Sequence, residues 1–507
     1  MSQTQAPSAA AAKESARSRV RPVQHLIGGR FVPAAEGGTF ETVDPTTNQP
    51  ITSVADGDAT DIDRAVLAAR RAFDEGPWPR LAAGPRARLL RRIAELIEAA
   101  DQEIAEIETL DTGLPITQAR GQAQRAAQNF RFFAAQIEVM AGESFTTPQF
   151  LNYAIRKPAG VAGLITPWNT PFMLETWKVA PCLAAGDTLV LKPAEWSPLS
   201  ADVLAHVLQE AGLPDGVANV VHGFGETAGA PLVAHPGVQL ISFTGETTTG
   251  SAIIANGAAT LKRYSMELGG KSPVVVFADC DLDRAVDAAV FGVFSLNGER
   301  CTAGTRLLVE RPIYDEFVGR VAERARKVRV GDPFEPRTEL GPLIHPEHHA
   351  RVSRYLEIGK DEGRLLAGGG RPDGLEQGNY VAATVFADVA PSARVFQEEI
   401  FGPVVVATPF EGEEEALRLA NGVRYGLAAY VWTRDVQRGQ RVAQGIESGM
   451  VWLNSQNVRD LRTPFGGSKA SGIGREGGEH SFEFYCEQQT VHVALGDVPV
   501  PRFGAGD

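Results

Sequence analysis

The sequence has 507 residues, of which 43% are hydrophobic and 22% charged, values typical of a globular protein of two or three domains. Its 49 basic and 62 acidic side chains leave a formal net charge of −13, and the basic residues are scattered, so a nucleic acid would be repelled. The longest apolar stretches are interrupted well short of the roughly 18 to 20 residues that a membrane-spanning helix needs. We therefore expect neither a nucleic-acid partner nor a transmembrane segment.

The N-terminal residues 1–21 are rich in Ala, Ser, Gln and Arg, but they lack the apolar core of a signal peptide. We expect a mobile tail there. A transit peptide is the alternative, although the segment contains Glu14 and has no clear amphipathic period.

Helical periodicity comes first along the chain. Residues 58–73 begin with a capping Asp and place apolar residues at helical spacing, and residues 85–110 repeat that pattern over many turns. From residue 160 the pattern changes to short apolar runs at 160–166, 188–193, 218–223 and 238–245, with a helical segment at 200–212. Alternating strands and helices of this kind predict a parallel α/β sheet.

A second series of strands and helices follows Cys301. Strand-like runs at 305–310, 404–410 and 450–454 alternate with helical patterns at 313–328 and 413–421. Two parallel-sheet α/β domains are therefore predicted. Strand-like segments at 150–160 and 488–495 fall outside both series, and exposed strand edges are natural sites for pairing with another subunit, so we expect a homo-oligomer.

Three polar stretches follow predicted strands directly: "ITPWNTP" at 165–171, "KPAEWSP" at 192–198 and "FTGETTTG" at 243–250. Ligands of open α/β sheets bind beyond the carboxyl ends of the strands. No GxGxxG follows the first strand of the α/β series, and "GFGETAG" at 223–229 has the wrong spacing, so the usual dinucleotide fingerprint is absent.

The four cysteines differ in their surroundings. Cys182, Cys280, Cys301 and Cys486 are far apart without a CxxC pair, which argues against a disulfide framework or a metal site and fits a cytoplasmic protein. Cys301 alone lies in a polar stretch, "NGERCTAG" at 297–304, directly after an apolar run. A small buried residue is the better interpretation of the other three, whereas Cys301 is a candidate nucleophile.

Together with "MELGGKSP" at 266–273, "QEEIFGPV" at 397–404 and "PFGGSKASGIGRE" at 464–476, these motifs make the sequence resemble the aldehyde dehydrogenase superfamily from about Ile27 to Val498. The resemblance implies a Rossmann-like NAD-binding domain at 22–142 and 158–266, and a catalytic domain at 267–480. It also implies a small β extension at 143–157 and 487–500 that joins subunits of a homodimer or homotetramer.

The resemblance implies a catalytic set of Cys301, Glu267, Asn169 and Lys178. A thiolate can add to an aldehyde carbonyl, and loss of hydride then gives a thioester that water can open. Glu267 matches the base for that hydrolysis, and Asn169, with the Cys301 backbone N–H, matches the donors that hold the oxyanion. A glutamate beside a turn is usually just solvated, so the role of Glu267 depends on its motif.

The implied cofactor is NAD. Lys192 and Glu195 match a pair that binds the adenine ribose, and Glu399 with Phe401 matches a pair at the nicotinamide end; an ordinary exposed charge pair is the alternative for the first two. Because a carboxylate would repel the 2′-phosphate of NADP, Glu195 favours NAD. The further implied contacts are Ile165, Thr166, Pro167, Trp168, Gly225, Phe243, Gly245, Glu246, Gly250 and Leu268. Glu246 departs from the commoner serine, and a carboxylate near phosphate is unfavourable unless it points away.

Within the superfamily, "NSQNVRDLRTPFGG" at 454–467 resembles the branch that oxidises semialdehydes of aromatic-ring breakdown. The implied substrate is 5-carboxymethyl-2-hydroxymuconate semialdehyde, with 2-hydroxymuconate semialdehyde or betaine aldehyde as alternatives. Arg459 and Arg462 could both bind its carboxylates, with Trp177 as a further contact, or they could pair with Asp460 or another subunit. An acylating enzyme that uses coenzyme A and a catalytically silent relative are rival classes, but they typically lack Glu267 or Cys301.

Overall fold

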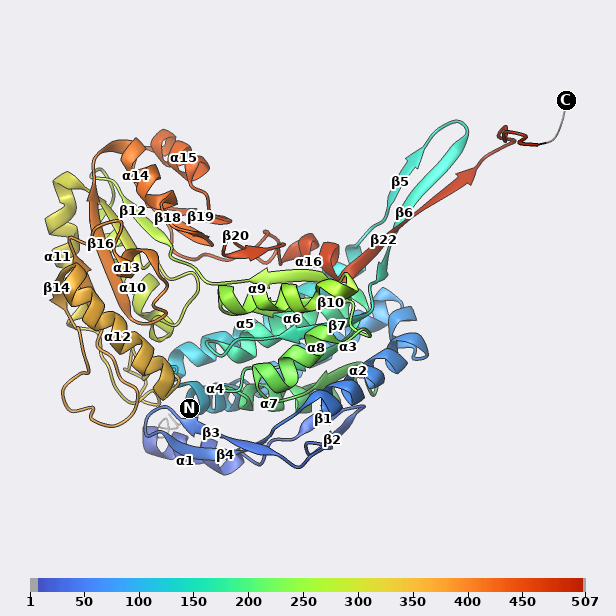
Figure 1. Ribbon diagram of the computed structural model, residues 1–507, viewed down its shortest axis with the longest axis horizontal. Coiled ribbons are helices and arrows are strands. Elements are labelled where there is room, and N and C mark those ends of the chain that lie inside the picture. The colour runs from blue at the N-terminus through green and yellow to red at the C-terminus, as the bar shows by residue number, and fades with distance from the viewer. Residues whose placement is uncertain (1–7, 505–507) are drawn as a thin grey trace, which may run out of the picture.

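The computed structural model describes residues 8–504 and contains two large sheets with helices packed on them (Figure 1). The first has the order β2-β1-β9-β8-β7-β10-β11-β21, and its five central strands, from β9 to β11, are parallel. Its strands are β1 (His25–Ile27), β2 (Arg30–Val32), β7 (Val161–Ile165), β8 (Thr188–Lys192), β9 (Ala218–Val220), β10 (Leu240–Thr244), β11 (Arg263–Glu267) and β21 (Gly472–Ile473). All residues of β7 and β8 are buried, as expected of strands covered on both faces.

The second sheet has the order β14-β15-β16-β13-β12-β18-β19, and only its edge pair β14–β15 is antiparallel. Its strands are β12 (Pro273–Val276), β13 (Arg306–Glu310), β14 (Arg364–Ala367), β15 (Thr384–Ala387), β16 (Val404–Phe410), β18 (Ala428–Trp432) and β19 (Met450–Leu453). The predicted α/β class with two mainly parallel sheets is confirmed.

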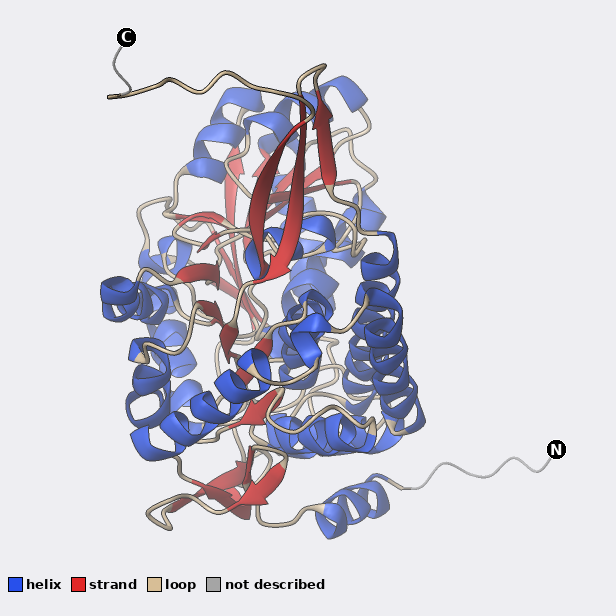
Figure 2. Cartoon of the chain, turned by 90° about the vertical axis from the view of Figure 1, so that its right-hand side faces the viewer, coloured by secondary structure: helices blue, strands red, loops and turns tan. Residues whose placement is uncertain are grey.

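Helices flank the strands in Figure 2. Those of the N-terminal half are α2 (Ala59–Asp74), α3 (Ala83–Ala99), α4 (Asp101–Thr112), α5 (Ile116–Val139), α6 (Pro171–Ala185), α7 (Leu199–Glu210), α8 (Ala230–Ala234) and α9 (Thr247–Gly257). The C-terminal half has α10 (Leu282–Phe294), α11 (Tyr314–Ala325), α12 (Pro346–Glu362), α13 (Arg394–Gln397), α14 (Gly412–Asn421), α15 (Val436–Gly445) and α16 (Gly478–Tyr485). The periodic stretch 85–110 is two helices, because α3 ends at Ala99 and α4 begins at Asp101. Among the described residues, no helix is long and apolar enough to cross a membrane.

The N-terminal segment is not a mobile tail over residues 8–19. Helix α1 (Ala9–Arg19) buries Ala12 and Ala16, and its Lys13 and Arg17 pair with Asp44 at 2.9 and 2.7 Å. The buried alanines and the two ion pairs hold the helix against the rest of the chain. Neither feature produces the long amphipathic pattern from which a helix can be predicted, so the sequence did not reveal it. Residues 1–7 of the predicted tail lie outside the described part of the chain.

Two smaller features concern the ends of the predicted domains. Strand β21 lies within the predicted catalytic range 267–480 but pairs with β11 of the first sheet, so that range is not confined to the second sheet. Strands β5 (Glu143–Thr146), β6 (Phe150–Pro158) and β22 (Cys486–Ala494) form an antiparallel arm that projects from the body (Figure 1). Two short ribbons complete the fold, β3 (Thr39–Asp44) with β4 (Gln49–Ala55) and β17 (Tyr425–Gly426) with β20 (Ser468–Lys469).

Candidate active site

A tightly fixed loop presents Cys301. Residues 296–298 all have positive φ angles, between 54° and 71°, which is a left-handed run that needs support. Asn297 supplies it, because its buried side-chain amide donates to the backbone oxygens of Gly113 and Pro342, both at 3.0 Å. The polar motif around the cysteine therefore fixes the loop to α4 and to the segment before α12.

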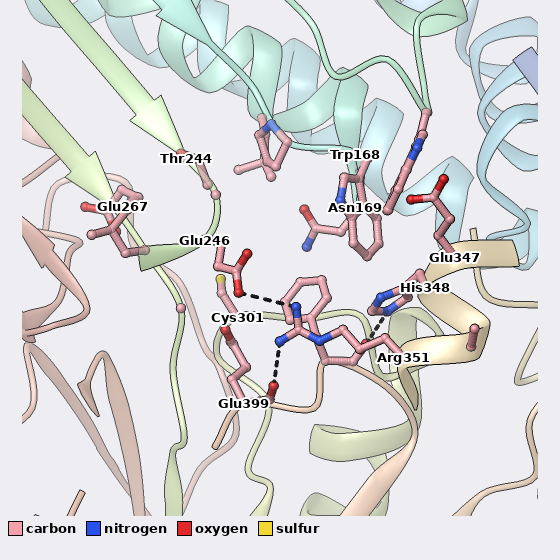
Figure 3. Close-up of a pocket in the computed structure, with 18 of the residues that line it drawn as sticks. Trp168, Asn169, Thr244, Glu246, Glu267, Cys301, Glu347, His348, Arg351 and Glu399 are labelled. Carbon is pink, nitrogen blue, oxygen red and sulfur yellow. Dashed lines mark hydrogen bonds and ion pairs between the residues drawn. The ribbon is translucent and has the colours of Figure 1, made fainter. Parts of the chain in front are cut away.

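Cys301 lines a cavity of about 520 Å³ between the two sheets, with Asn169, Glu267, Glu399 and Phe401, which we term the catalytic cavity (Figure 3). A groove of about 620 Å³ adjoins it and runs beyond the carboxyl ends of β7, β8 and β10; we term it the cofactor groove. The groove is lined by the following predicted cofactor contacts: Ile165, Thr166, Pro167, Trp168, Lys192, Glu195, Gly225, Phe243, Gly245 and Glu246. The structure thus brings together residues that are far apart in the sequence.

Glu267 ends strand β11 and is 4% exposed, and neither of its carboxyl oxygens has a hydrogen-bond partner within the described residues. Burial, then the charge of Glu476, raises its pKa well above the ordinary value. A Cβ at Gly466 would lie 2.7 Å from Glu267 Oε1, so a glycine is needed where the chain passes the carboxyl group. Glu267 is a buried acid without a hydrogen-bond partner in residues 8–504, which suits a proton acceptor better than a structural ion.

The Cys301 thiol is held in its neutral form. Burial, helped by the charges of Glu399 and Glu267, raises its pKa to about 11 against the opposing charge of Arg300. The sequence analysis predicts that Cys301 is the nucleophile, and the reactive form of a cysteine is the thiolate. The structure shows that attack on a carbonyl has to be coupled to removal of the thiol proton.

Asn169 follows β7 and is 7% exposed. Its Nδ2 donates one hydrogen to the backbone oxygen of Glu299 at 2.8 Å, which orients the amide and leaves its second hydrogen for a ligand. Figure 3 shows Asn169 on the wall of the cavity that contains Cys301. This is the arrangement that an oxyanion donor requires.

The side chain of Lys178 lies behind the catalytic cavity and not on its wall. Its fully buried ammonium pairs with Glu476 at 2.9 Å and donates to Ser242 Oγ at 2.8 Å. Trp177, predicted as a substrate contact, instead donates its indole N–H to Glu476 and is 3% exposed. Glu476 was missed as a functional residue, although it ends the motif "PFGGSKASGIGRE".

Two of the predicted cofactor residues, Gly250 and Leu268, do not line the cofactor groove. A Cβ at Gly250 would lie 2.6 Å from Leu268, so Gly250 allows α9 to approach that side chain and does not line the groove. Leu268 lines the catalytic cavity. Lys192 and Glu195 do lie in the groove, where Lys192 is only 3% exposed and pairs with Glu195 at 3.1 Å, so they are not an ordinary exposed pair.

The other end of the site is formed by Glu399 and Phe401. Glu399 accepts a hydrogen bond from the Gly270 backbone N–H at 2.8 Å, and burial raises its pKa to about 7. Phe401 has a φ of +62°, a strained value for a bulky residue, and its ring meets Trp168 edge-on at 5.2 Å. Strain of this kind indicates that Phe401 is held in place for a purpose other than packing alone.

The two predicted substrate arginines lie in different places. The Arg459 guanidinium lies 3.9 Å from the Trp177 ring centre, and its buried Nη2 has no hydrogen-bond partner within the described residues. Burial lowers its pKa to about 9, and Glu267 and Cys301 are among the charges that act on it. Arg462 is 79% exposed and pairs with Asp460 at 2.6 Å, so the predicted pocket position of Arg462 is wrong and the surface alternative holds.

Arg125 on α5 was missed by the sequence analysis. Burial and the charge of Arg300 lower its pKa, and Arg125 in turn acts on Arg459. None of these three arginines forms an ion pair within residues 8–504. An arginine on a long amphipathic helix carries no sequence signal for this role, because only the tertiary fold brings it close to residues 300 and 459.

Comparisons with known proteins agree with this geometry. The model of the aldehyde dehydrogenase family matches residues 31–491. The chain is 51% identical to 5-carboxymethyl-2-hydroxymuconate semialdehyde dehydrogenase of Escherichia coli, over 91% of this chain and 99% of the relative. It is 47% identical to 2-hydroxymuconic semialdehyde dehydrogenase of Pseudomonas sp. (strain CF600), over 94% and 100%.

Among solved structures, HpcC from Thermus thermophilus superimposes with a TM-score of 0.95 at 53% identity, covering 97% of both chains. Sequence and structure are thus shared over nearly the whole length of both chains. The chain therefore belongs to the aldehyde dehydrogenase family and is an NAD(P)-dependent aldehyde oxidoreductase.

Proposed function

We propose that the protein oxidises an acidic semialdehyde to the acid with NAD, and that its substrate is 5-carboxymethyl-2-hydroxymuconate semialdehyde in the catabolism of homoprotocatechuate and 4-hydroxyphenylacetate. The observation that carries the substrate class is the guanidinium of Arg459 beside the catalytic cavity, which has no ion-pair partner among residues 8–504 and is reinforced by Arg125 and Arg300. Buried cations without a carboxylate partner are costly unless a ligand supplies the anion. A substrate with several carboxylates would supply it.

The proposed first step forms a bond between Cys301 Sγ and the aldehyde carbon, and the thiol proton leaves to a base. The carbonyl oxygen becomes an oxyanion that Asn169 Nδ2 and the Cys301 backbone N–H stabilise. The cofactor, when bound, accepts the hydride that leaves this carbon. The product on the enzyme is a thioester of Cys301.

In the second step Glu267 takes a proton from a water molecule, the water oxygen attacks the thioester carbon, and the carbon–sulfur bond breaks. The carboxylic acid departs, and the proton on Glu267 passes to the Cys301 thiolate, which regenerates the thiol and the ionised base. Glu267 must be ionised to accept this proton, yet its pKa is raised. We infer that the Lys178–Glu476 ion pair helps to set the pKa of Glu267, because the charge of Glu476 raises this pKa and the charge of Lys178 lowers it.

Lys192 and Glu195 would hold the adenine ribose, and Glu399 with Phe401 would position the nicotinamide end. A carboxylate accepts from both ribose hydroxyls and repels a 2′-phosphate, which supports NAD over NADP. The arrangement also supports this assignment, since Trp168 and Gly245 line both the catalytic cavity and the cofactor groove and so join them into one continuous site.

Two other substrates compete with this assignment. The relative named for 2-hydroxymuconic semialdehyde makes that smaller acidic substrate the second candidate. Betaine aldehyde is disfavoured, because its quaternary ammonium would meet the positive charge of Arg125, Arg300 and Arg459. We also propose that β5, β6 and β22 join subunits of a dimer or tetramer, and that the protein acts in the cytoplasm.

The test is NADH formation with three aldehydes of similar size, one with two carboxylates, one with a single carboxylate and one uncharged, each with and without coenzyme A. We expect the highest kcat/KM for the dianionic semialdehyde and no stimulation by coenzyme A. A preference for the uncharged aldehyde would contradict the substrate class and leave the family assignment intact. Dependence on coenzyme A would contradict the hydrolytic role of Glu267.

A further inference from the structure

The junction of the catalytic cavity and the cofactor groove contains a carboxylate. Glu246 lines both spaces and directly precedes α9, where its backbone is extended and its side chain caps no helix N–H. The side chain is 53% exposed, so it is free to interact with groups across the junction. Any dinucleotide that runs from the groove into the cavity has to pass it.

Arg351 reaches Glu246 from the opposite side. It comes from α12, and its Nη1 lies 3.3 Å from Glu246 Oε1 while its Nη2 donates to the backbone oxygen of Glu399 at 3.0 Å. Figure 3 shows this arginine between the two glutamates. The ion pair thus links α9, next to the first sheet, to the loop that contains Glu399.

Helix α12 also touches the groove at two aromatic contacts. The His345 ring, just before α12, stacks on Trp196 at 4.5 Å, and His348 meets Trp168 edge-on at 4.9 Å. These contacts keep the start of α12 near the groove, so Arg351 does not need to move far to meet a ligand. Because the Glu246–Arg351 pair is half exposed, it is weak and replaceable.

We propose that the Glu246–Arg351 ion pair is a gate across the site, and that Arg351 exchanges Glu246 for the pyrophosphate of the cofactor when the cofactor binds. The inference rests on the proposed use of NAD. A pyrophosphate carries two negative charges, so it attracts the guanidinium more strongly than one carboxylate does, and it repels Glu246. The exchange explains why a carboxylate is compatible with a position near the pyrophosphate. Glu246 pairs with Arg351 in the empty site, and its side chain points away from the pyrophosphate in the occupied site.

Calorimetric titration with ADP-ribose, which contains the pyrophosphate but cannot react, tests the gate in the full-length protein. Glu246→Gln should tighten binding by about three- to tenfold, because it removes a repulsive charge and frees Arg351. Arg351→Gln should weaken binding by a similar factor. Adenosine, which has no phosphate, should bind all variants equally, and Glu411→Gln, which removes a remote charge, should leave ADP-ribose binding unchanged.

The decisive comparison is the increase in ADP-ribose affinity that Glu246→Gln causes in the unmodified protein and in the Arg351→Gln variant. If Arg351 must leave Glu246 to bind the phosphates, the gain should be at least about twofold smaller in the Arg351→Gln background, since no pair is then broken. Arg351→Lys, which keeps the charge, should retain the larger gain and also serves if the glutamine variant does not fold. An equal gain in the unmodified and Arg351→Gln backgrounds would overturn the gate while leaving the cofactor assignment intact. Failure of the unmodified protein to bind ADP-ribose would overturn the cofactor assignment itself.

Discussion

The charged groups of the catalytic cavity and of the cofactor groove differ in whether they have partners. The carboxyl of Glu267 in the cavity and Nη2 of Arg459 beside it are buried without hydrogen-bond partners within the described residues. In the groove, Lys192 pairs with Glu195, and at the junction of the two spaces Glu246 pairs with Arg351. The reactive part of the site therefore keeps groups without partners that can take a proton or bind an anion, whereas the binding part holds its charges in pairs that a ligand can rearrange.

The first prediction concerns Cys301, the proposed nucleophile in the catalytic cavity. Cys301→Ala should lower aldehyde oxidation by roughly 10⁴-fold or more, because no other described group in the cavity can form the thioester. ADP-ribose binding should be nearly unchanged, since the adenosine end lies in the other space. Steady-state NADH formation and calorimetry check the two halves of this prediction. Substantial turnover by the alanine variant would contradict the covalent mechanism.

The second prediction concerns the unpartnered Glu267. Glu267→Gln should slow turnover by about 10²- to 10⁴-fold by impairing thioester hydrolysis. If another group can take the thiol proton, a rapid-mixing experiment should show a burst of NADH equal to the enzyme concentration. A normal steady-state rate would remove Glu267 from the role of base.

The pH profile provides an independent check on Glu267. A base works in its ionised form, so hydrolysis should be lost as the pH falls through the pKa of Glu267. Because burial raises this pKa well above its ordinary value of 4.5, the loss should occur at a higher pH than an exposed glutamate would give. The deacylation rate measured from about pH 5 to about pH 9 gives the answer, and a rate that stays flat down to the acid end of that range would contradict it.

The third prediction uses two arginines of one loop as a matched pair. Arg459→Met should reduce kcat/KM for the dianionic semialdehyde by about 2 to 4 kcal/mol, because a partly buried charged contact is lost. Arg462→Met should have little effect, since Arg462 is exposed and paired with Asp460. Activity of both variants toward a neutral aldehyde should change little. Equal losses on charged and neutral substrates would show that Arg459 has a structural role.

This loop also shows how far sequence reasoning could go. The alternation of strands and helices predicted the two mainly parallel sheets, and the motifs of the resemblance predicted three residues that line the catalytic cavity, Cys301, Glu267 and Asn169. Both predictions depend on short patterns that are continuous along the chain. Whether Arg459 or Arg462 faces the cavity depends on how the loop between β19 and β20 folds against Trp177, which no local pattern contains. Arg125 and Arg351 were missed for the same reason: each is an ordinary residue of an amphipathic helix until the fold brings it to the site.

The smallest expected effect lies in the groove, where the charges are paired. Glu195→Gln should raise the affinity for NADP relative to NAD by a few-fold, because it removes the repulsion between the carboxylate and the 2′-phosphate. The change should be modest, since Glu195 is partly exposed and already neutralised by Lys192 at 3.1 Å. The same substitution leaves Lys192 without its partner, and a free ammonium there would attract the 2′-phosphate and add to the shift.

Lys192→Met combined with Glu195→Gln separates the two contributions, because it should abolish any part of the gain in NADP affinity that comes from the freed ammonium. Titrations with NAD and NADP measure the ratio for each variant, and a parent protein that already binds NADP more tightly would show that this pair does not select the cofactor.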